Sequence, residues 1–401
     1  MSALPDQPSN AVLLSGATGF VGMELLARYL ERTERHVYVL VRAADDAVAR
    51  ARVHATLDDL GVPAADFDSR VTAVAADIEL DGLGLSAVRR VDLAMRVSDV
   101  IHCAASVSFT MSLARSRLIN VGGTRQMLEL ARLSHERGGL ERFAYVSTAY
   151  VAGTHPGEFR EDQLDVGQDF RNAYERSKFE AETLVRGHAG RLPIQIFRPS
   201  IIVGEQRSGW TSSFNVLYPP LKAFVRGSLP FLPADRSAPV DVVPVDYVAD
   251  AMFTLASEPV RESGETFHLV SGDGATTVGG LAQRAASHLE RRPPRILPPK
   301  LYLRLIHPLL ARTGSDARRR ALSSSEVFFP YFTMQVRFDD RAARRRLVWQ
   351  GVRVVPVEWY LDRLIDFARA ADWGRRKVPR QRVVTRPRRE ASDKRRELSR
   401  V

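Results

Sequence analysis

Strand-like apolar runs alternate with helical patterns through the first half of this 401-residue chain. Runs rich in Val, Leu and Ile predict strands at Ala11–Ser15, His36–Val41, Val71–Ala75, Asp99–Cys103, Phe143–Ser147 and Pro193–Phe197. Helical patterns lie between them at Phe20–Arg32, Ala43–Leu60, Asn120–Arg137 and Asn172–His188. Strands that alternate with longer helical segments form βαβ units, whose strands are parallel. The chain is therefore predicted to be an α/β protein with a doubly wound parallel sheet, which binds ligands at the carboxyl ends of its strands.

Prolines break this rhythm after Gly204, which is typical of a loop-rich region. We expect a smaller, mostly helical C-terminal subdomain there, with a strand near Glu265–Val270 and a helix over Val278–Arg291. The predicted parts are a disordered N-terminus at 1–10, a Rossmann-like dinucleotide-binding domain at 11–204, a substrate-binding subdomain at 205–373 with some return to the sheet near 240–270, and a basic disordered tail at 374–401. The apolar and basic stretch at 291–314 is predicted to be subdomain core, with a surface for an acyl chain or bilayer as the alternative.

The net charge of +11 would ordinarily suggest a nucleic-acid partner, but most of it lies at one end of the chain. From Gly374 onward the chain holds 12 of its 58 Lys and Arg residues against 3 of its 47 Asp and Glu residues, so the rest is close to neutral. We therefore expect no nucleic-acid partner. The tail is interpreted as a solvating segment, with peripheral contact to an anionic membrane as the alternative. Removal of the residues after Trp373 is expected to leave activity intact.

The single cysteine, Cys103, excludes an intrachain disulfide framework, and the first ten residues lack the apolar segment of a secretion signal. These features predict a cytoplasmic protein, with peripheral attachment to the inner membrane face as the alternative. No metal is expected, because the 9 His residues are scattered and no cluster offers ligand spacing.

Three glycines, Gly16, Gly19 and Gly22, lead from the first predicted strand into the first predicted helix. In that context Gly16 permits a tight turn, Gly19 lets the backbone approach a pyrophosphate, and Gly22 lets the helix pack on the sheet. The helix N-terminus favours the phosphate charge. The loop therefore predicts a dinucleotide site, and neighbouring residues are included among the cofactor contacts: Thr18, Phe20 and Val21.

The end of the second predicted strand bears on the choice between NAD and NADP, because an acidic residue there binds the ribose 2′-hydroxyl of NAD. This chain has Arg42 at that point, and its planar guanidinium fits a 2′-phosphate, so NADPH is predicted. Asp45 and Asp46 follow within a turn, and either could serve NAD instead. Residues after the third and fourth strands are predicted to border the adenine and to pass beneath the cofactor: Asp77, Ile78, Cys103, Ala104 and Ala105. Among these, the cysteine is expected to be a small core residue and not a nucleophile.

Tyr174 and Lys178 are four residues apart and so lie on one face of the predicted helix. A phenol with a pKa near 10 is a poor acid or base at neutral pH. A neighbouring ammonium favours the phenolate and is expected to bring the pKa of Tyr174 towards the working range. The helix follows a strand end rich in hydroxyl groups, on the side of the sheet where the cofactor is expected. The arrangement predicts proton transfer beside a nicotinamide.

Four motifs in order resemble the extended short-chain dehydrogenases/reductases over about Ala11–Asp250. They are the glycine loop, HCAA, YVSTAYVAG with YERSK, and FRPSIIVG with PVDYVAD. The resemblance implies that Thr148 orients the substrate carbonyl and that Tyr174 donates the proton. It also implies that Lys178 tunes this tyrosine and bonds the nicotinamide ribose.

Three further assignments come from the same resemblance. Ser147 is a close second for the hydroxyl role, because a slip of one residue exchanges it with Thr148. Asn120 matches the Asn-Val-x-Gly-Thr helix start of the family and is expected to support the site, although capping that helix is an equally good account. The FRPSIIVG motif adds Pro199 and Ile201 to the cofactor contacts.

Within that family the chain is similar to the acyl-thioester reductases, namely fatty acyl-CoA reductases and the reductase domains of carboxylic acid reductases and peptide synthetases. The similarity is carried by GATGFVGMELL, VYVLVRA, VIHCAASVSF and FRPSIIVGEQRSGW. It implies a set of substrate-facing residues: Val107, Phe109, Arg207 and Trp210. The expected activity is NADPH-dependent reduction of CoA-bound or carrier-bound acyl thioesters to aldehyde or alcohol. The alternatives are an alcohol or ketone oxidoreductase acting on a sterol, lipid or sugar nucleotide, and a non-catalytic dinucleotide-binding sensor.

Overall fold

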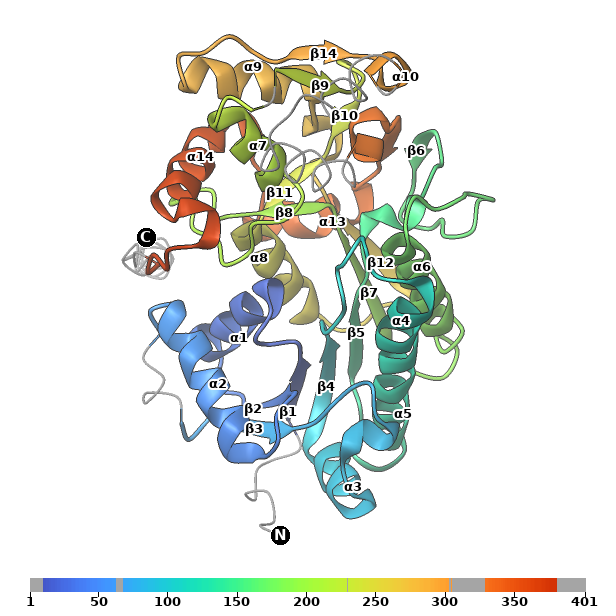
Figure 1. Ribbon diagram of the computed structural model, residues 1–401. Coiled ribbons are helices and arrows are strands. Elements are labelled where there is room, and N and C mark those ends of the chain that lie inside the picture. The colour runs from blue at the N-terminus through green and yellow to red at the C-terminus, as the bar shows by residue number, and fades with distance from the viewer. Residues whose placement is uncertain (1–9, 63–67, 229, 303, 305–328, 381–401) are drawn as a thin grey trace, which may run out of the picture.

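A seven-stranded parallel sheet with the order β12-β7-β5-β4-β1-β2-β3 forms the centre of the protein (Figure 1). The computed structural model describes residues 10–62, 68–228, 230–302, 304 and 329–380. The strands of the sheet are β1 (Ala11–Ser15), β2 (Val37–Val41), β3 (Val71–Ala75), β4 (Val97–His102), β5 (Arg142–Val146), β7 (Ile194–Pro199) and β12 (Glu265–Leu269). Five of them are buried along their whole length, as expected for a parallel sheet covered on both faces. The predicted α/β fold is confirmed.

Helices cover both faces of this sheet (Figure 1). One face packs against α1 (Phe20–Arg32), α2 (Asp46–Asp59) and α8 (Val245–Ala256). The other face packs against α3 (Ala87–Arg96), α5 (Gly123–Arg137) and α6 (Ala173–Arg186). The predicted helix over Asn120–Arg137 starts earlier than expected, because α4 (Leu113–Arg117) continues through a π turn at Leu118–Gly122 into α5.

The strand order reverses between β1 and β4, which are hydrogen-bonded neighbours. Successive connections lead from β1 towards β3 on one side and from β4 towards β12 on the other. At such a switch point the loops after the two central strands separate and leave a crevice at the carboxyl edge. Ser15 pairs in register with His102 there, so the glycine loop and the loop after β4 start side by side.

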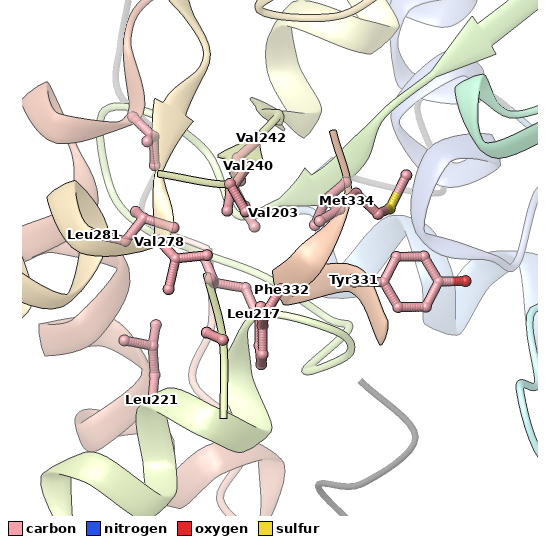
Figure 2. Close-up of a cluster of buried hydrophobic side chains, with 14 of the residues drawn as sticks. Val203, Leu217, Leu221, Val240, Val242, Val278, Leu281, Tyr331, Phe332 and Met334 are labelled. Atoms are coloured by element: carbon pink, nitrogen blue, oxygen red, sulfur yellow. The ribbon is translucent and has the colours of Figure 1, made fainter. Parts of the chain in front are cut away.

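The region after Gly204 contains helices and short strand pairs. Besides α8, its helices among the described residues are α7 (Tyr218–Val225), α9 (Val278–His288), α10 (Pro299–Leu301), α13 (Arg341–Leu347) and α14 (Leu361–Ala370). Short strands form pairs in this region, and two of the pairs include a strand from before Gly204. The pairs are β6 (Gly157–Phe159) with β15 (Val336–Phe338), β8 (Ile201–Val203) with β11 (Val242–Pro244), β9 (Phe231–Pro233) with β14 (Arg295–Leu297), and β10 (Pro239–Val240) with β13 (Thr276–Thr277). Figure 2 shows part of its apolar core, in which Leu217 and Phe332 lie near Val240. The predicted return to the sheet is β12, although the small strands were not predicted.

Several predicted segments lie outside the described residues. They are residues 1–9 of the N-terminus, residues 303 and 305–314 of the stretch at 291–314, and residues 381–401 of the basic tail. Within the described ranges no helix is long and apolar enough to cross a membrane.

The start of the basic tail lies against the folded body, although the sequence predicted disorder from Gly374 onward. The indole Nε1 of Trp210 donates a hydrogen bond to the carbonyl oxygen of Val378 at 3.3 Å. The guanidinium of Arg380 lies 5.7 Å from the centre of the Trp210 ring. We call Lys377–Arg380 the C-terminal strap. The strap covers a buried indole, which composition alone could not show.

Two carboxylates of the body attract the end of the strap. Arg380 pairs with Glu205 and, at 3.4 Å, with Glu24 of α1. The side chain of Glu24 is fully buried, and burial raises its pKa, whereas Arg28 and Arg380 lower it. A buried carboxylate needs cationic partners, so the strap stabilises the packing around α1.

We expect Arg380→Ala to lower the free energy of unfolding by about 1–3 kcal/mol at neutral pH, because Glu24 loses a charged partner. Deletion of all residues after Trp373 should cost at least as much, in contrast to the expectation from sequence. The loss should be larger at pH 8 than at pH 5, because protonation of Glu24 relieves its unpaired charge. Urea unfolding at the two pH values measures this difference.

Two controls accompany that measurement. A chain ending at Gln381 keeps the strap and should unfold like the full chain. Lys377→Ala removes a 74% exposed side chain paired with Asp59 and should change stability by less than about 1 kcal/mol. Equal losses in all four proteins would contradict the assignment to Arg380.

Candidate active site

The glycine loop forms a tight turn directly after β1. Gly16 has a φ of +77°, a conformation that favours glycine, and the amide of Gly19 donates to its carbonyl at 2.9 Å. A Cβ at Gly16 would lie 2.6 Å from the backbone nitrogen of Ala104, and one at Gly22 would lie 2.1 Å from the Gly16 carbonyl oxygen. The turn therefore packs closely against the loop after β4 and against the start of α1, and side chains at these two positions would clash with backbone.

The predicted cofactor residues follow the strands of the sheet at its carboxyl edge. Thr18, Phe20 and Val21 belong to the loop and first turn after β1, and Arg42 follows β2. Asp77 and Ile78 come after β3, Cys103, Ala104 and Ala105 after β4, and Pro199 and Ile201 lie at the end of β7 and the start of β8. The thiol of Cys103 has its pKa raised to about 12 by burial, which agrees with a packing role and not with a nucleophile.

Helix α6 carries Tyr174 and Lys178 on one face. The side chain of Asn172 caps its N-terminus by accepting a hydrogen bond from the amide of Glu175 at 3.0 Å. Lys178 is 2% exposed, and its Nζ donates to the hydroxyl oxygen of Tyr145 at 2.8 Å and to the carbonyl oxygen of Val146 at 2.7 Å. Burial lowers the pKa of Lys178 to about 7. The α6 register thus places a buried amine against the end of β5.

The structure separates the two candidate hydroxyl groups. Ser147 donates to Glu182 on α6 at 2.6 Å, and Arg198 holds the pKa of that buried carboxyl down at about 2 although burial opposes it. Thr148 points elsewhere: its hydroxyl donates to the carbonyl oxygen of Pro199 at 3.4 Å and accepts from the amide of Tyr150 at 3.3 Å. It also lies close enough to the Tyr174 phenol to lower the pKa of that group. The geometry therefore brings Thr148, and not Ser147, to the phenol.

The pKa of Tyr174 differs from the sequence-based expectation. Burial raises it to about 12, and this effect is larger than the lowering by Thr148. The phenol is consequently protonated throughout the neutral range. In this state Tyr174 is a hydrogen-bond and proton donor.

Asn120 supports the site and does not cap a helix. It lies in the π turn before α5, and its Nδ2 donates to the hydroxyl of Ser177 at 2.9 Å and to the carbonyl of Ser106 at 3.1 Å. Its Oδ1 accepts from the Ser106 amide at 2.8 Å. Capping falls to Ser112, which accepts from the Arg115 amide at the start of α4. Asn120 therefore ties the loop after β4 to the helix that carries Tyr174.

An aromatic row extends from Tyr174 into the C-terminal region. The ring of Phe109 lies 5.5 Å from Tyr174 and 5.3 Å from Tyr331, centre to centre. Tyr150 lies 5.3 Å from Tyr331 and 5.8 Å from Phe338. Three of these rings line a small apolar cavity of about 20 Å³, whose walls are Tyr150, Ile201, Val216, Leu217, Pro239, Val240, Asp241, Tyr331, Phe332, Met334, Val336 and Phe338. Figure 2 shows Tyr331 beside Met334 at the edge of the apolar cluster.

The other predicted substrate residues lie apart from this row. Trp210 is 4% exposed, packed in the core and covered by the strap, so its predicted role in facing substrate is not supported. Arg207 is exposed on a separate hollow of about 230 Å³ that it shares with Trp359 and Arg363. Val107 is 57% exposed in the loop that carries Phe109. No group of three or more potential metal ligands occurs among the described residues.

Sequence reasoning missed Tyr331 and Tyr145. Tyr331 belongs to no local sequence pattern, because it lies in a 3₁₀ turn far along the chain from α6. Its hydroxyl accepts a hydrogen bond from Asn172 Nδ2 at 2.7 Å. Tyr145 stands in the strand that the motif covered, two residues before Ser147, and the period of two along a strand could have placed both on the α6 face.

We expect Ser147→Ala to lower the free energy of unfolding by about 1.5–3 kcal/mol, because it removes a hydrogen bond to a buried carboxylate. Ser134→Ala is the matched control, since Ser134 is buried and donates to the neutral carbonyl of Val97 at 2.8 Å. Its loss should be about 0.5–1.5 kcal/mol. Chemical unfolding at pH 7 compares them, and an equal or smaller loss for Ser147→Ala would contradict the charged partner.

Comparisons with known proteins show which family and which relatives this chain is similar to. Residues 14–252 match the family model described as Male sterility protein. The nonribosomal peptide synthetase asaC of Aspergillus flavus is 32% identical over 272 residues, which cover 65% of this chain and 26% of that protein. The fatty acyl-CoA reductase wat of Drosophila melanogaster is 29% identical over 289 residues, covering 64% of this chain and 55% of that protein. The terminal R domain from the myxalamid PKS-NRPS biosynthetic pathway superposes with a TM-score of 0.79 at 26% identity, covering 92% of both chains. The chain thus matches about a quarter to about half of the length of these two relatives.

Proposed function

Because this chain belongs to the Male sterility protein family, we propose that it reduces acyl thioesters with NADPH and releases a thiol and an aldehyde. The resemblance to the extended short-chain dehydrogenases/reductases, and among them to acyl reductases, is confirmed by the family match and by the reductase relatives. The observation that carries the proposal is the contact between the Thr148 and Tyr174 hydroxyls, next to an aromatic row and at the edge of the sheet where the glycine turn lies.

The residues at this edge fit a nicotinamide dinucleotide. At Gly16 and Gly22 the backbone segments approach too closely for a Cβ, which gives the tight turn at the N-terminus of α1 that suits a pyrophosphate. When bound, the nicotinamide supplies a hydride to the acyl carbonyl carbon. Lys178, with two N–H bonds held by the protein, has a third to offer to a ribose hydroxyl.

The hydroxyls of Thr148 and Tyr174 stabilise the charge that develops on the carbonyl oxygen. Both are fixed by the fold, Thr148 after β5 and Tyr174 on α6, so they need little reorganisation. A pKa of about 12 keeps the phenol protonated until the oxyanion forms, and the oxyanion is basic enough to take its proton. The resulting hemithioacetal then collapses: its C–S bond breaks, its hydroxyl proton passes to the departing sulfur, and the aldehyde and the thiol are released. Phe109, Tyr331 and Tyr150 give the acyl chain an apolar wall.

The contacts around Arg42 support NADPH over NAD. Its side chain is 72% exposed and has a single long contact of 3.4 Å with Glu79, so it can turn to a 2′-phosphate. The carboxylates that would serve NAD have structural partners. Asp45 caps α2 through the amide of Val48 at 2.8 Å, and Asp46 accepts from the amide of Ala75 at 2.8 Å.

The proposal is tested by mixing the protein with NADPH and a long-chain acyl-CoA. We expect free thiol and aldehyde to appear in step with NADPH oxidation, and Tyr174→Phe to lower kcat by about 10²–10⁴-fold through loss of the proton donor. Its affinity for NADPH should stay unchanged. Normal turnover of this variant would contradict the mechanism. NADPH oxidation by an added ketone, without thiol release from acyl-CoA, would favour the alcohol or ketone oxidoreductase instead.

We expect Arg42→Ala to weaken NADPH binding by about 10–100-fold, because it removes a charged contact to the 2′-phosphate, and to leave NADH binding unchanged. Arg50→Ala is the control, since Arg50 lies on α2, is 61% exposed and pairs with Asp68. Isothermal titration with both nucleotides measures the ratio. Equal effects of Arg42→Ala on NADPH and NADH would contradict the assignment.

A further inference from the structure

The amine of Lys178 is held by a second tyrosine that the proposed chemistry does not use. Tyr145 is 1% exposed, and its hydroxyl oxygen accepts from Lys178 Nζ at 2.8 Å. The amine also lies 4.3 Å from the centre of the same ring. The hydroxyl of Tyr145 is directed at this amine, so we argue its role through the lysine.

Tyr145 is itself fixed from behind by a chain of buried polar groups. The Thr124 hydroxyl donates to the carbonyl oxygen of Asn120 at 2.6 Å and lies close enough to the Tyr145 phenol to lower its pKa, which burial raises. Thr124 also lies 3.1 Å from His102 Nε2, and His102 Nδ1 lies 2.8 Å from the hydroxyl of Ser15, the last residue of β1. The chain runs from the catalytic helix to the residue that precedes the glycine turn. It gives the phenol oxygen one position, in which it faces the amine.

We propose that Tyr145 is a positioning residue for Lys178, which fixes the ammonium and stabilises its charged form. Two of the three N–H bonds are taken by Tyr145 and by the carbonyl of Val146, so the third has a defined direction toward a ligand. This inference rests on the proposed function only in assigning that third bond to a nucleotide ribose. The contacts of Tyr145 and Val146 with the amine are made within the protein and require no ligand.

The other ionisable groups around Lys178 do not replace this contact. Burial lowers the pKa of His102 to about 3 and raises that of Cys103 to about 12, so both are neutral at pH 7. Glu182, one turn along α6, is anionic but is engaged by Arg198 and Ser147. Tyr174, one turn earlier, is protonated, as burial raises its pKa to about 12. The phenol oxygen of Tyr145 and one backbone carbonyl therefore solvate the ammonium.

The test is a direct titration of Lys178 in wild type and in Tyr145→Phe, without nucleotide. The chain has five lysines, so ¹³C-lysine spectra are simple, and Lys178→Arg identifies the signal. Removal of a hydrogen bond to a charged group disfavours that form. We expect the pKa of Lys178 to fall by about 1–2 pH units in Tyr145→Phe. If activity needs the ammonium, the alkaline limb of the kcat profile should move to lower pH by the same amount.

Tyr29→Phe is the matched control. Tyr29 is 2% exposed on α1, and its hydroxyl has no hydrogen-bond partner among the described residues, so the variant loses the same atom without losing a contact to an amine. Its Lys178 signal and pH profile should match wild type. An unchanged Lys178 pKa in a folded Tyr145→Phe protein would overturn the inference. If Tyr145→Phe does not fold, Tyr145→Leu also removes the hydroxyl, and an unchanged Lys178 pKa in that folded variant would overturn the inference as well.

The two proposals can fail separately. Absence of thiol release by wild type would remove the thioester assignment and leave the Lys178 titration intact. If the pKa of Lys178 shifts in Tyr145→Phe but the pH dependence of kcat does not, Tyr145 still positions the amine, and the link between the ammonium and turnover is overturned.

Discussion

The register between strand β5 and helix α6 is the constraint on which the site depends. Tyr145 in β5 and Ser147, directly after the strand, bond to Lys178 and Glu182, which are one turn apart on the helix. A strand repeats every two residues and a helix nearly every four, so two such bonds fix both the rotation and the height of α6. Tyr174, one turn before Lys178, is then brought to the hydroxyl of Thr148. A helix shifted by one residue would bring neither pair together.

Because charged groups are buried at this register, a change of register would cost a large amount of free energy. Glu182 and Arg198 are fully buried with each other, and Ser147 and Arg186 add further bonds to the carboxylate. Breaking such a group by removing one member leaves a charge without partners in a medium of low dielectric constant. The same burial that raises the pKa of Tyr174 lowers that of Lys178. Structure and acid-base chemistry therefore have one cause, the exclusion of water from the seam between β5 and α6.

Local spacing in the sequence was enough to predict the glycine turn, the sheet and the Tyr174 and Lys178 pair. These features depend on residues within a few positions of one another, and their strand and helix periods are visible in one dimension. The choice between Ser147 and Thr148 was not predictable, because it depends on where β5 ends to within one residue. Trp210 was predicted to face substrate, but a strap from the far end of the chain covers it. Tyr331 was not found, since only the fold brings it to the start of α6.

The hydrogen bond between Tyr331 and Asn172 connects two parts of the site that carry different tasks. Asn172 caps the helix that holds Tyr174, the proposed proton donor, whereas Tyr331 belongs to the aromatic lining of the neighbouring cavity. That cavity, at about 20 Å³, holds little more than a water molecule. A bulky occupant has to displace its lining, and displacement of Tyr331 withdraws a bond from the cap. Filling the cavity would thereby act on the N-terminal cap, and so on the first turn, of α6.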